Sequence, residues 1–124
     1  MIIVLDTNFL IYLVKHRIAD KIKDFGAKLV VPETVEKELS KPSFGPEEKK
    51  FAAAALELIK IWKAIIMPAK LKNVDKSIIG VASELKELGE EVKVATMDEE
   101  LRGKLRASGI GLITLKRGKI LVLE

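Results

Sequence analysis

The stretch that decides the fold is Ile2-Ile3-Val4-Leu5-Asp6-Thr7-Asn8, at the start of the chain. Four bulky apolar residues in a row favour a short buried strand, because β-branched side chains suit a pleated surface. Phe9, Leu10 and Leu13 then repeat at helical spacing. Asp6 therefore stands where a strand ends and a helix begins. In an open α/β sheet, ligands bind outside this end of the strands.

The same alternation of strand and helix continues along the chain. Strands are expected at residues 2–5, 29–31, 65–67, 92–96, 111–115 and 120–123. Helices are expected after Asn8 and at residues 18–25, 32–39, 47–63, 75–88 and 98–107. This order predicts a three-layer α/β/α architecture with a mostly parallel central sheet covered on both faces. We expect the last two strands to pair as an edge hairpin, residues 40–46 to form a loop, and 32–39 and 47–63 to form a helical arm.

Composition limits the kind of site that the chain can carry. Its 124 residues suit a single domain, so we expect residues 1–124 to share one core. There is no cysteine, and the only histidine is His16. A cysteine-based or histidine-rich metal site is therefore excluded. Any bound metal has to be held mainly by oxygen atoms, which favours Mg²⁺ or Mn²⁺.

Charge and hydropathy predict the surroundings and the partners. The net charge of +4 suits a polyanionic partner. No basic run precedes the first apolar stretch, and no apolar run approaches the roughly eighteen residues that span a bilayer. We therefore expect a cytoplasmic protein with no membrane partner. A charged fraction of 32%, mainly Lys and Glu, is typical of thermophiles.

Four acids occupy comparable places in this pattern. Asp6 and Asp98 follow strands, Asp75 begins a helix, and Glu38 lies near the end of one. Each aspartate alone is explained as a helix N-cap, and Glu38 alone as a solvated charge. If the four converge at one sheet edge, however, their mutual repulsion requires a cation. The set then predicts a divalent metal site.

Four stretches of the chain, which together span nearly all of it, resemble the motif blocks of the PIN domain family in the family's order. They are Leu5-Asp6-Thr7-Asn8, Val31-Pro32-Glu33-Thr34-Val35-Glu36-Lys37-Glu38-Leu39, Val74-Asp75-Lys76-Ser77-Ile78-Ile79 and Ala95-Thr96-Met97-Asp98-Glu99-Glu100-Leu101. The resemblance implies a fold like that of the 5′-flap nucleases and a metal-dependent endoribonuclease that leaves 5′-phosphate and 3′-hydroxyl ends.

The same resemblance assigns roles to individual residues. Asp6, Glu38, Asp75 and Asp98 would be the catalytic, metal-holding quartet. The residues that orient these acids would be Thr7, Asn8 and Thr96. The chain departs from the family pattern twice. Lys76 stands where many archaeal members carry a second acid, and Met97 stands where a polar residue often precedes the last acid.

An RNA substrate needs cations at the rim of so acidic a site. Candidate phosphate contacts include Lys15, Lys41 and Arg102. Arg102 follows Asp98 by one helical turn, so it is the first choice.

Two biological roles fit the resemblance. One is a toxin that a partner antitoxin silences. The other is RNA processing with a ribosome-assembly partner, as in archaeal relatives of the small-subunit processome nuclease, which this sequence resembles more closely. The family resemblance also implies a homodimer. Lys76 keeps open a non-catalytic PIN-fold module that binds RNA or protein.

Two other classes fit less well. A phosphatase of the haloacid dehalogenase type needs a second aspartate two residues after Asp6, and Asn8 stands there. A receiver domain needs an acidic pair after the first strand and a phosphate-accepting aspartate in mid-chain, and the chain has neither.

Overall fold

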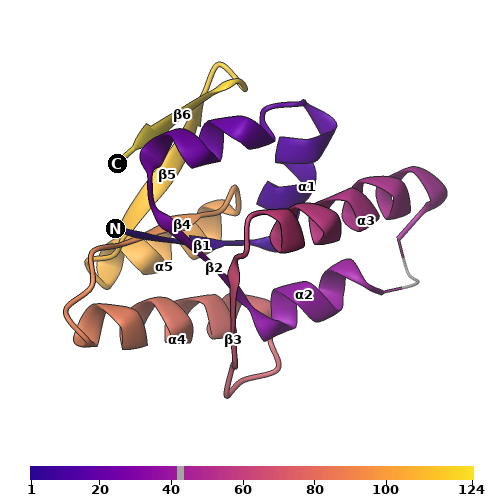
Figure 1. Cartoon of the computed structure of the whole chain (residues 1–124). Helices are drawn as coiled ribbons and strands as arrows, with labels where there is room; N and C mark the ends of the chain where they lie inside the picture. Colours follow the sequence, from indigo (N-terminus) through magenta and orange to yellow (C-terminus); the bar gives the residue numbers. More distant parts are fainter. Residues whose placement is uncertain (42–43) are drawn as a thin grey trace.

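One six-stranded sheet organises the computed structural model, which describes residues 1–41 and 44–124 (Figure 1). Its strands are β1 (Ile2–Leu5), β2 (Lys28–Pro32), β3 (Ile65–Met67), β4 (Val92–Ala95), β5 (Gly111–Lys116) and β6 (Ile120–Leu123). Their spatial order is β3-β2-β1-β4-β5-β6. The first five strands run parallel, and β6 pairs antiparallel with β5. The predicted mostly parallel sheet and its edge hairpin are confirmed.

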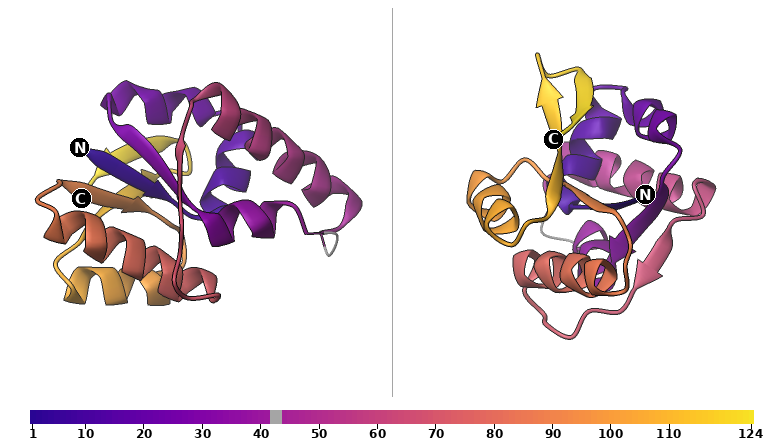
Figure 2. Two further views of the ribbon diagram at one scale, coloured as in Figure 1. Left: turned by 60° about the horizontal axis from the view of Figure 1, so that its bottom comes forward. Right: turned by 90° about the vertical axis from the view of Figure 1, so that its left-hand side faces the viewer.

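Helices cover both faces of this sheet. They are α1 (Thr7–Lys15), the 3-10 helix η1 (Ala19–Phe25), α2 (Glu33–Leu39), α3 (Pro46–Ile61), α4 (Val74–Glu87) and α5 (Glu99–Ala107). Helices α4 and α5 lie on one face, and α1, η1 and α3 lie on the other (Figure 2). The three-layer α/β/α architecture predicted from the sequence is therefore confirmed. Among the described residues, no helix has the length and apolar character needed to cross a membrane.

Helices α2 and α3 pack together and project from one side of the molecule, as the expected helical arm (Figure 1). The expected loop 40–46 includes residues 42–43, which lie outside the described residues. Pro46 belongs to α3 rather than to the loop. Proline is suited to a first helical turn because the N–H that it lacks has no partner there.

Strand β1 is the centre of the core. Ile3, Val4 and Leu5 are fully buried, because β2 and β4 flank the strand and helices cover both faces. The parallel register pairs Leu5 with Ala95, so β1 and β4 end side by side. The next residue continues this pairing, since the backbone N–H of Asp6 donates to the carbonyl of Ala95 over 3.1 Å. The two strand-end motifs are thereby brought together.

Candidate active site

The four predicted acids line one cleft of about 420 Å³. Each comes from a different part of the fold: the β1–α1 junction, the end of α2, the first turn of α4 and the β4–α5 junction. The lining residues are Asp6, Asn8, Glu38, Val74, Asp75, Met97 and Asp98. Segments up to 92 residues apart in the chain therefore contribute carboxylates to one space.

Asp6 is the most buried of the four acids, with 6% of its surface exposed. One carboxylate oxygen, Oδ1, accepts the backbone N–H of Thr7 over 2.7 Å, and Oδ2 accepts the hydroxyl of Thr96 over 2.7 Å. Burial raises the pKa of Asp6, and these two hydrogen bonds offset part of that rise. The negative charges of Asp75 and Glu38 raise the pKa further, which shows that the three carboxylates share one electrostatic environment.

Thr96 joins two of the acids. Its fully buried hydroxyl donates to Asp6 and accepts the backbone N–H of Asp98 over 3.3 Å. Thr7 makes its contact with Asp6 through the backbone alone. Its own hydroxyl is buried and has no hydrogen-bond partner among the described residues. Asn8 is exposed and faces the cleft as one of its lining residues.

Asp75 is not the N-cap of α4, although its position at the start of the helix suits that role. Asn73 is the N-cap of α4, because its side-chain oxygen accepts the N–H of Lys76 over 3.0 Å. Burial raises the pKa of Asp75, as do the charges of Asp98, Glu100 and Glu38, while Lys104 lowers it. The Asp75 carboxylate is therefore available to the cleft.

Asp98 and Glu38 lie closer to solvent. Asp98 is the N-cap of α5, and its Oδ1 accepts the N–H of Leu101 over 3.0 Å. Glu38 is half-buried, one residue before the buried Leu39. A hydrogen bond between the hydroxyls of Thr34 and Ser77 ties α2 to α4, and so holds the helices that carry Glu38 and Asp75 together.

The donor set suits a divalent cation, because it consists of carboxylate oxygens and their charges raise the pKa of Asp6 and of Asp75. Among the described residues, however, no three acidic or histidine side chains stand close enough to hold a metal ion as they are placed. Metal binding would require the exposed or half-buried side chains of Glu38, Asp75 and Asp98 to turn toward Asp6.

Arg102 is not an accessible phosphate contact, and this expectation is corrected. Its side chain is buried, and its guanidinium donates to Thr96, Ile113, Thr114 and Glu124. The sequence did contain a signal for this burial. Arg102 lies between Leu101 and Leu105, which form the apolar face of α5.

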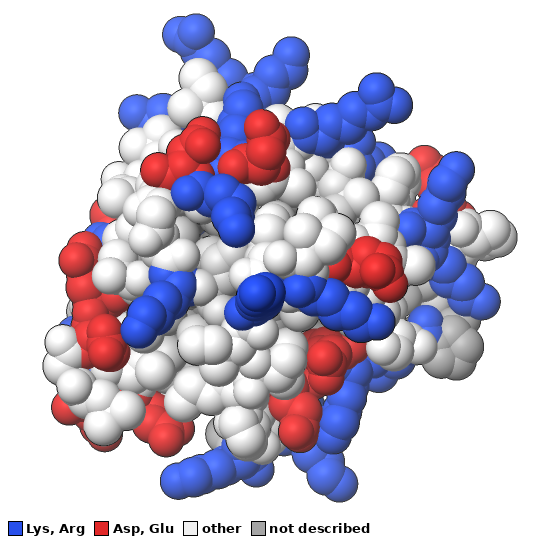
Figure 3. All heavy atoms as spheres, in the orientation of Figure 1, with Lys and Arg blue, Asp and Glu red and all other residues white. Residues whose placement is uncertain are grey.

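The other two basic candidates do not line the cleft. Lys15 and Lys41 are exposed, and neither is among its lining residues. Lys104 is the basic residue whose charge acts on Asp75. Across the face seen in Figure 3, lysine and arginine side chains alternate with acidic ones and form no single basic patch.

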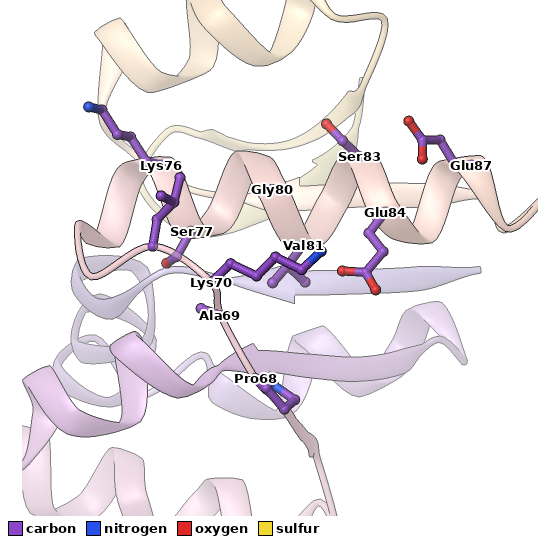
Figure 4. A pocket seen from close by; sticks show the side chains of 11 residues that line it. Pro68, Ala69, Lys70, Lys76, Ser77, Gly80, Val81, Ser83, Glu84 and Glu87 are labelled. Atoms are coloured by element: carbon purple, nitrogen blue, oxygen red, sulfur yellow. The ribbon is translucent and has the colours of Figure 1, made fainter.

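Lys76, the departure from the family pattern, is absent from the cleft lining. It lines a separate cavity of about 480 Å³ between α4 and the segment that includes Pro68 and Lys70 (Figure 4). The lysine therefore does not occupy the space in which the four acids meet.

Comparisons with known proteins agree with this architecture. The family described as PIN like domain matches residues 3–119. Ribonuclease VapC4 of Methanocaldococcus jannaschii is 31% identical over 124 residues, covering 94% of this chain and 92% of that protein. The solved structure of the PIN domain endonuclease Utp24 superposes with a TM-score of 0.78 at 21% identity, over 99% of this chain and 90% of that one. In sequence and in fold, the chain belongs to the PIN domain family.

Proposed function

We propose that this protein is a divalent-metal-dependent endoribonuclease that hydrolyses RNA phosphodiester bonds and leaves 5′-phosphate and 3′-hydroxyl ends. The observation that carries the proposal is the single cleft lined by Asp6, Glu38, Asp75 and Asp98. The ribonuclease and endonuclease relatives support it. A bound Mg²⁺ or Mn²⁺ would supply charge neutralisation at the phosphate and a water of lowered pKa.

The chain's own residues would hold that cation and orient its ligands. Each oxygen of Asp6 accepts one hydrogen bond and retains a second lone pair for a metal. Thr96 and the Thr7 N–H fix the rotation of this carboxylate, so it is pre-organised. Glu38, Asp75 and Asp98 would complete the site from the other elements that line the cleft. The charge of the exposed Lys104 acts on Asp75, so Lys104 is the lysine that we expect to contact the RNA phosphates.

The test is cleavage of a labelled single-stranded RNA with Mn²⁺, with Mg²⁺ and with EDTA. We expect cleavage with either metal and none with EDTA. Asp6→Asn should lower the rate at least about a hundredfold, because it removes a charged ligand while keeping the side chain's shape. Asp24→Asn, which changes an exposed aspartate of η1, is the matched control and should cut like the wild type.

Two results would overturn the proposal. Cleavage by Asp6→Asn at the wild-type rate would remove the cleft from the mechanism. A folded wild-type protein that binds RNA but cuts it with neither metal would favour the non-catalytic module. Lys76 is exposed and is not among the residues that line the acidic cleft, which supports the nuclease over that module.

The similarity to VapC4 supports a role as the toxin of a toxin–antitoxin pair, with an antitoxin as partner, and the likeness to Utp24 supports RNA processing. Induced expression separates these roles. A toxin arrests bacterial growth, and Asp6→Asn relieves the arrest, whereas a processing nuclease leaves growth unchanged. Size-exclusion chromatography tests the expected homodimer.

A further inference from the structure

Arg102 is a buried cation that the proposed chemistry does not use. Only 6% of its surface is exposed, and it lies one turn after Asp98 on α5. A buried guanidinium is costly unless hydrogen bonds and an opposite charge compensate it. Its partners therefore indicate what the side chain does.

The guanidinium joins the end of β4 to the middle of the neighbouring strand β5. One nitrogen, Nη1, donates to the carbonyl of Thr96 over 3.0 Å and to the carbonyl of Ile113 over 3.1 Å. Thr96 directly follows β4, and Ile113 belongs to β5. The planar fork of arginine lets Nη1 hold these carbonyls while Nη2 donates elsewhere, and a lysine ammonium, with a single nitrogen, does not reproduce both sets of contacts.

The residue that Arg102 holds is the one that orients the acids. The carbonyl of Thr96 accepts from Arg102, while its hydroxyl donates to Asp6 and accepts the N–H of Asp98. A displacement of the Thr96 backbone would therefore move the partners of both acids. Arg102 itself touches neither carboxylate through any of its hydrogen bonds within the described residues.

Glu124 holds the other side of the guanidinium. Nη2 of Arg102 donates to Glu124 Oε2 over 3.0 Å and to the Thr114 hydroxyl over 2.8 Å. The backbone of Glu124 also pairs in both directions with Leu112 of β5. Because these backbone hydrogen bonds hold Glu124 in place, its carboxylate can orient the guanidinium of Arg102. Glu124, which directly follows β6, is thereby linked to Thr96 through the side chain of Arg102.

We propose that Arg102, oriented by Glu124, is a positioning residue that fixes the Thr96–Asp98 turn and so sets how tightly the acidic cleft binds its metal ion. The proposal deepens the proposed function and rests on it. Residues that orient metal ligands typically change metal affinity or activity by about 10- to 100-fold when removed. The same range is expected here.

The experiment measures Mn²⁺ affinity on the protein without RNA, together with kcat and KM for RNA cleavage. Arg102→Met should weaken Mn²⁺ binding about 10- to 100-fold and lower kcat, with KM for RNA within about twofold. Arg102→Lys keeps the charge but not the fork, so it should restore only part of the loss. Circular dichroism at the assay temperature establishes that each variant is folded.

The control is Lys60 of α3, an exposed lysine that pairs with Glu57 on the same helix. Lys60→Met should leave Mn²⁺ affinity and kcat within about twofold. If Arg102→Met does not fold, Glu124→Gln replaces it as the decisive variant. The amide keeps the shape of Glu124 but removes its charge. We expect a smaller loss of Mn²⁺ affinity in the same direction.

The outcomes separate the inference from the proposed function. Wild-type protein that neither binds Mn²⁺ nor cuts RNA would defeat the proposed function first. If the wild type binds and cuts, unchanged Mn²⁺ affinity in folded Arg102→Met and Glu124→Gln overturns the inference. A raised KM with unchanged Mn²⁺ affinity would also overturn it, because the loss would then lie in RNA binding and not in the metal site. Full rescue by Arg102→Lys would show that charge, and not the fork, matters.

Discussion

At the scale of single residues, burial and hydrogen bonding have opposite effects on the pKa of Asp6. Asp6 accepts two short hydrogen bonds, which favour its ionised form, yet its pKa is raised. Burial is the largest of the contributions, and the charges of Asp75 and Glu38 add to it. Ionisation of Asp6 therefore costs folding stability, which a bound cation would offset.

This cost predicts a pH dependence of stability. The pKa of Asp6 is raised in the folded state above its ordinary value of 3.8, so the folded protein binds this proton more tightly than the unfolded chain. The stabilising contribution is complete below pH 3.8 and is lost as pH rises through the raised pKa. Relative to Asp6→Asn, the metal-free wild type should lose unfolding free energy across that window and then reach a plateau.

Denaturant unfolding of both proteins in EDTA over a pH series measures this difference. The comparison cancels groups that titrate alike in the two proteins. If the unfolding free energy of the wild type minus that of Asp6→Asn stayed constant or increased as pH rises, the raised pKa of Asp6 would be contradicted.

The two threonines beside Asp6 make a matched pair. Thr96→Val leaves the buried Oδ2 of Asp6 without its partner, so unfolding free energy should fall by about 1–3 kcal/mol. Thr7→Val removes a buried hydroxyl that has no partner among the described residues, so it should change stability by less than about 1 kcal/mol. Chemical denaturation measures the unfolding free energy of both variants. Equal losses would contradict the claim that the Thr96 hydroxyl stabilises Asp6 and the Thr7 hydroxyl does not.

At the scale of elements, helix N-termini determine which acids are free. Asn73 caps α4 two residues before Asp75, whereas Asp98 is itself the cap of α5. The sequence shows suitable capping residues but does not choose between Asn73 and Asp75, because either residue type serves. The geometry of the chain entering α4 makes that choice.

The capping assignment is tested by Asn73→Ala. Loss of the bond to the Lys76 N–H should lower the unfolding free energy by about 1 kcal/mol. Lys72→Ala, at the exposed preceding residue, is the control and should change it by less than about 0.5 kcal/mol. If Asp75→Ala destabilised the protein in the same way while Asn73→Ala did not, the assignment would be reversed.

At the scale of the whole molecule, the strand order places the cleft. The chain runs from β1 outward through β2 to β3, then crosses to the other side of β1 with β4. The cleft therefore lies at the point where the winding direction changes, outside the carboxyl ends of β1 and β4. This arrangement collects residues that are far apart in the sequence.

Charge over the whole molecule predicts how RNA binding responds to salt. In the cleavage-deficient Asp6→Asn background, affinity for single-stranded RNA should fall as the salt concentration rises. Lysine and arginine side chains that contact phosphates release counterions from the RNA, and added salt opposes this release. Lys104→Met should weaken binding and lower the magnitude of the log–log salt slope by about 0.7, the value for one phosphate contact. Lys60→Met on α3, another exposed lysine paired with a nearby glutamate, is the control.

Fluorescence anisotropy of a labelled RNA measures these slopes. A Lys104→Met slope equal to that of Lys60→Met would show that Lys104 makes no phosphate contact.

The sequence by itself determined the alternation of strands and helices, because hydrophobic periodicity and turn residues act locally. It also determined that Asp6, Asp75 and Asp98 stand at element ends. Only the tertiary structure decided that Thr96 contacts Asp6 across 90 residues, and that the guanidinium of Arg102 donates to the carbonyl of Thr96. Those contacts depend on which strands are neighbours and on where α5 packs against them. That depends on packing over the whole chain, which no local pattern contains.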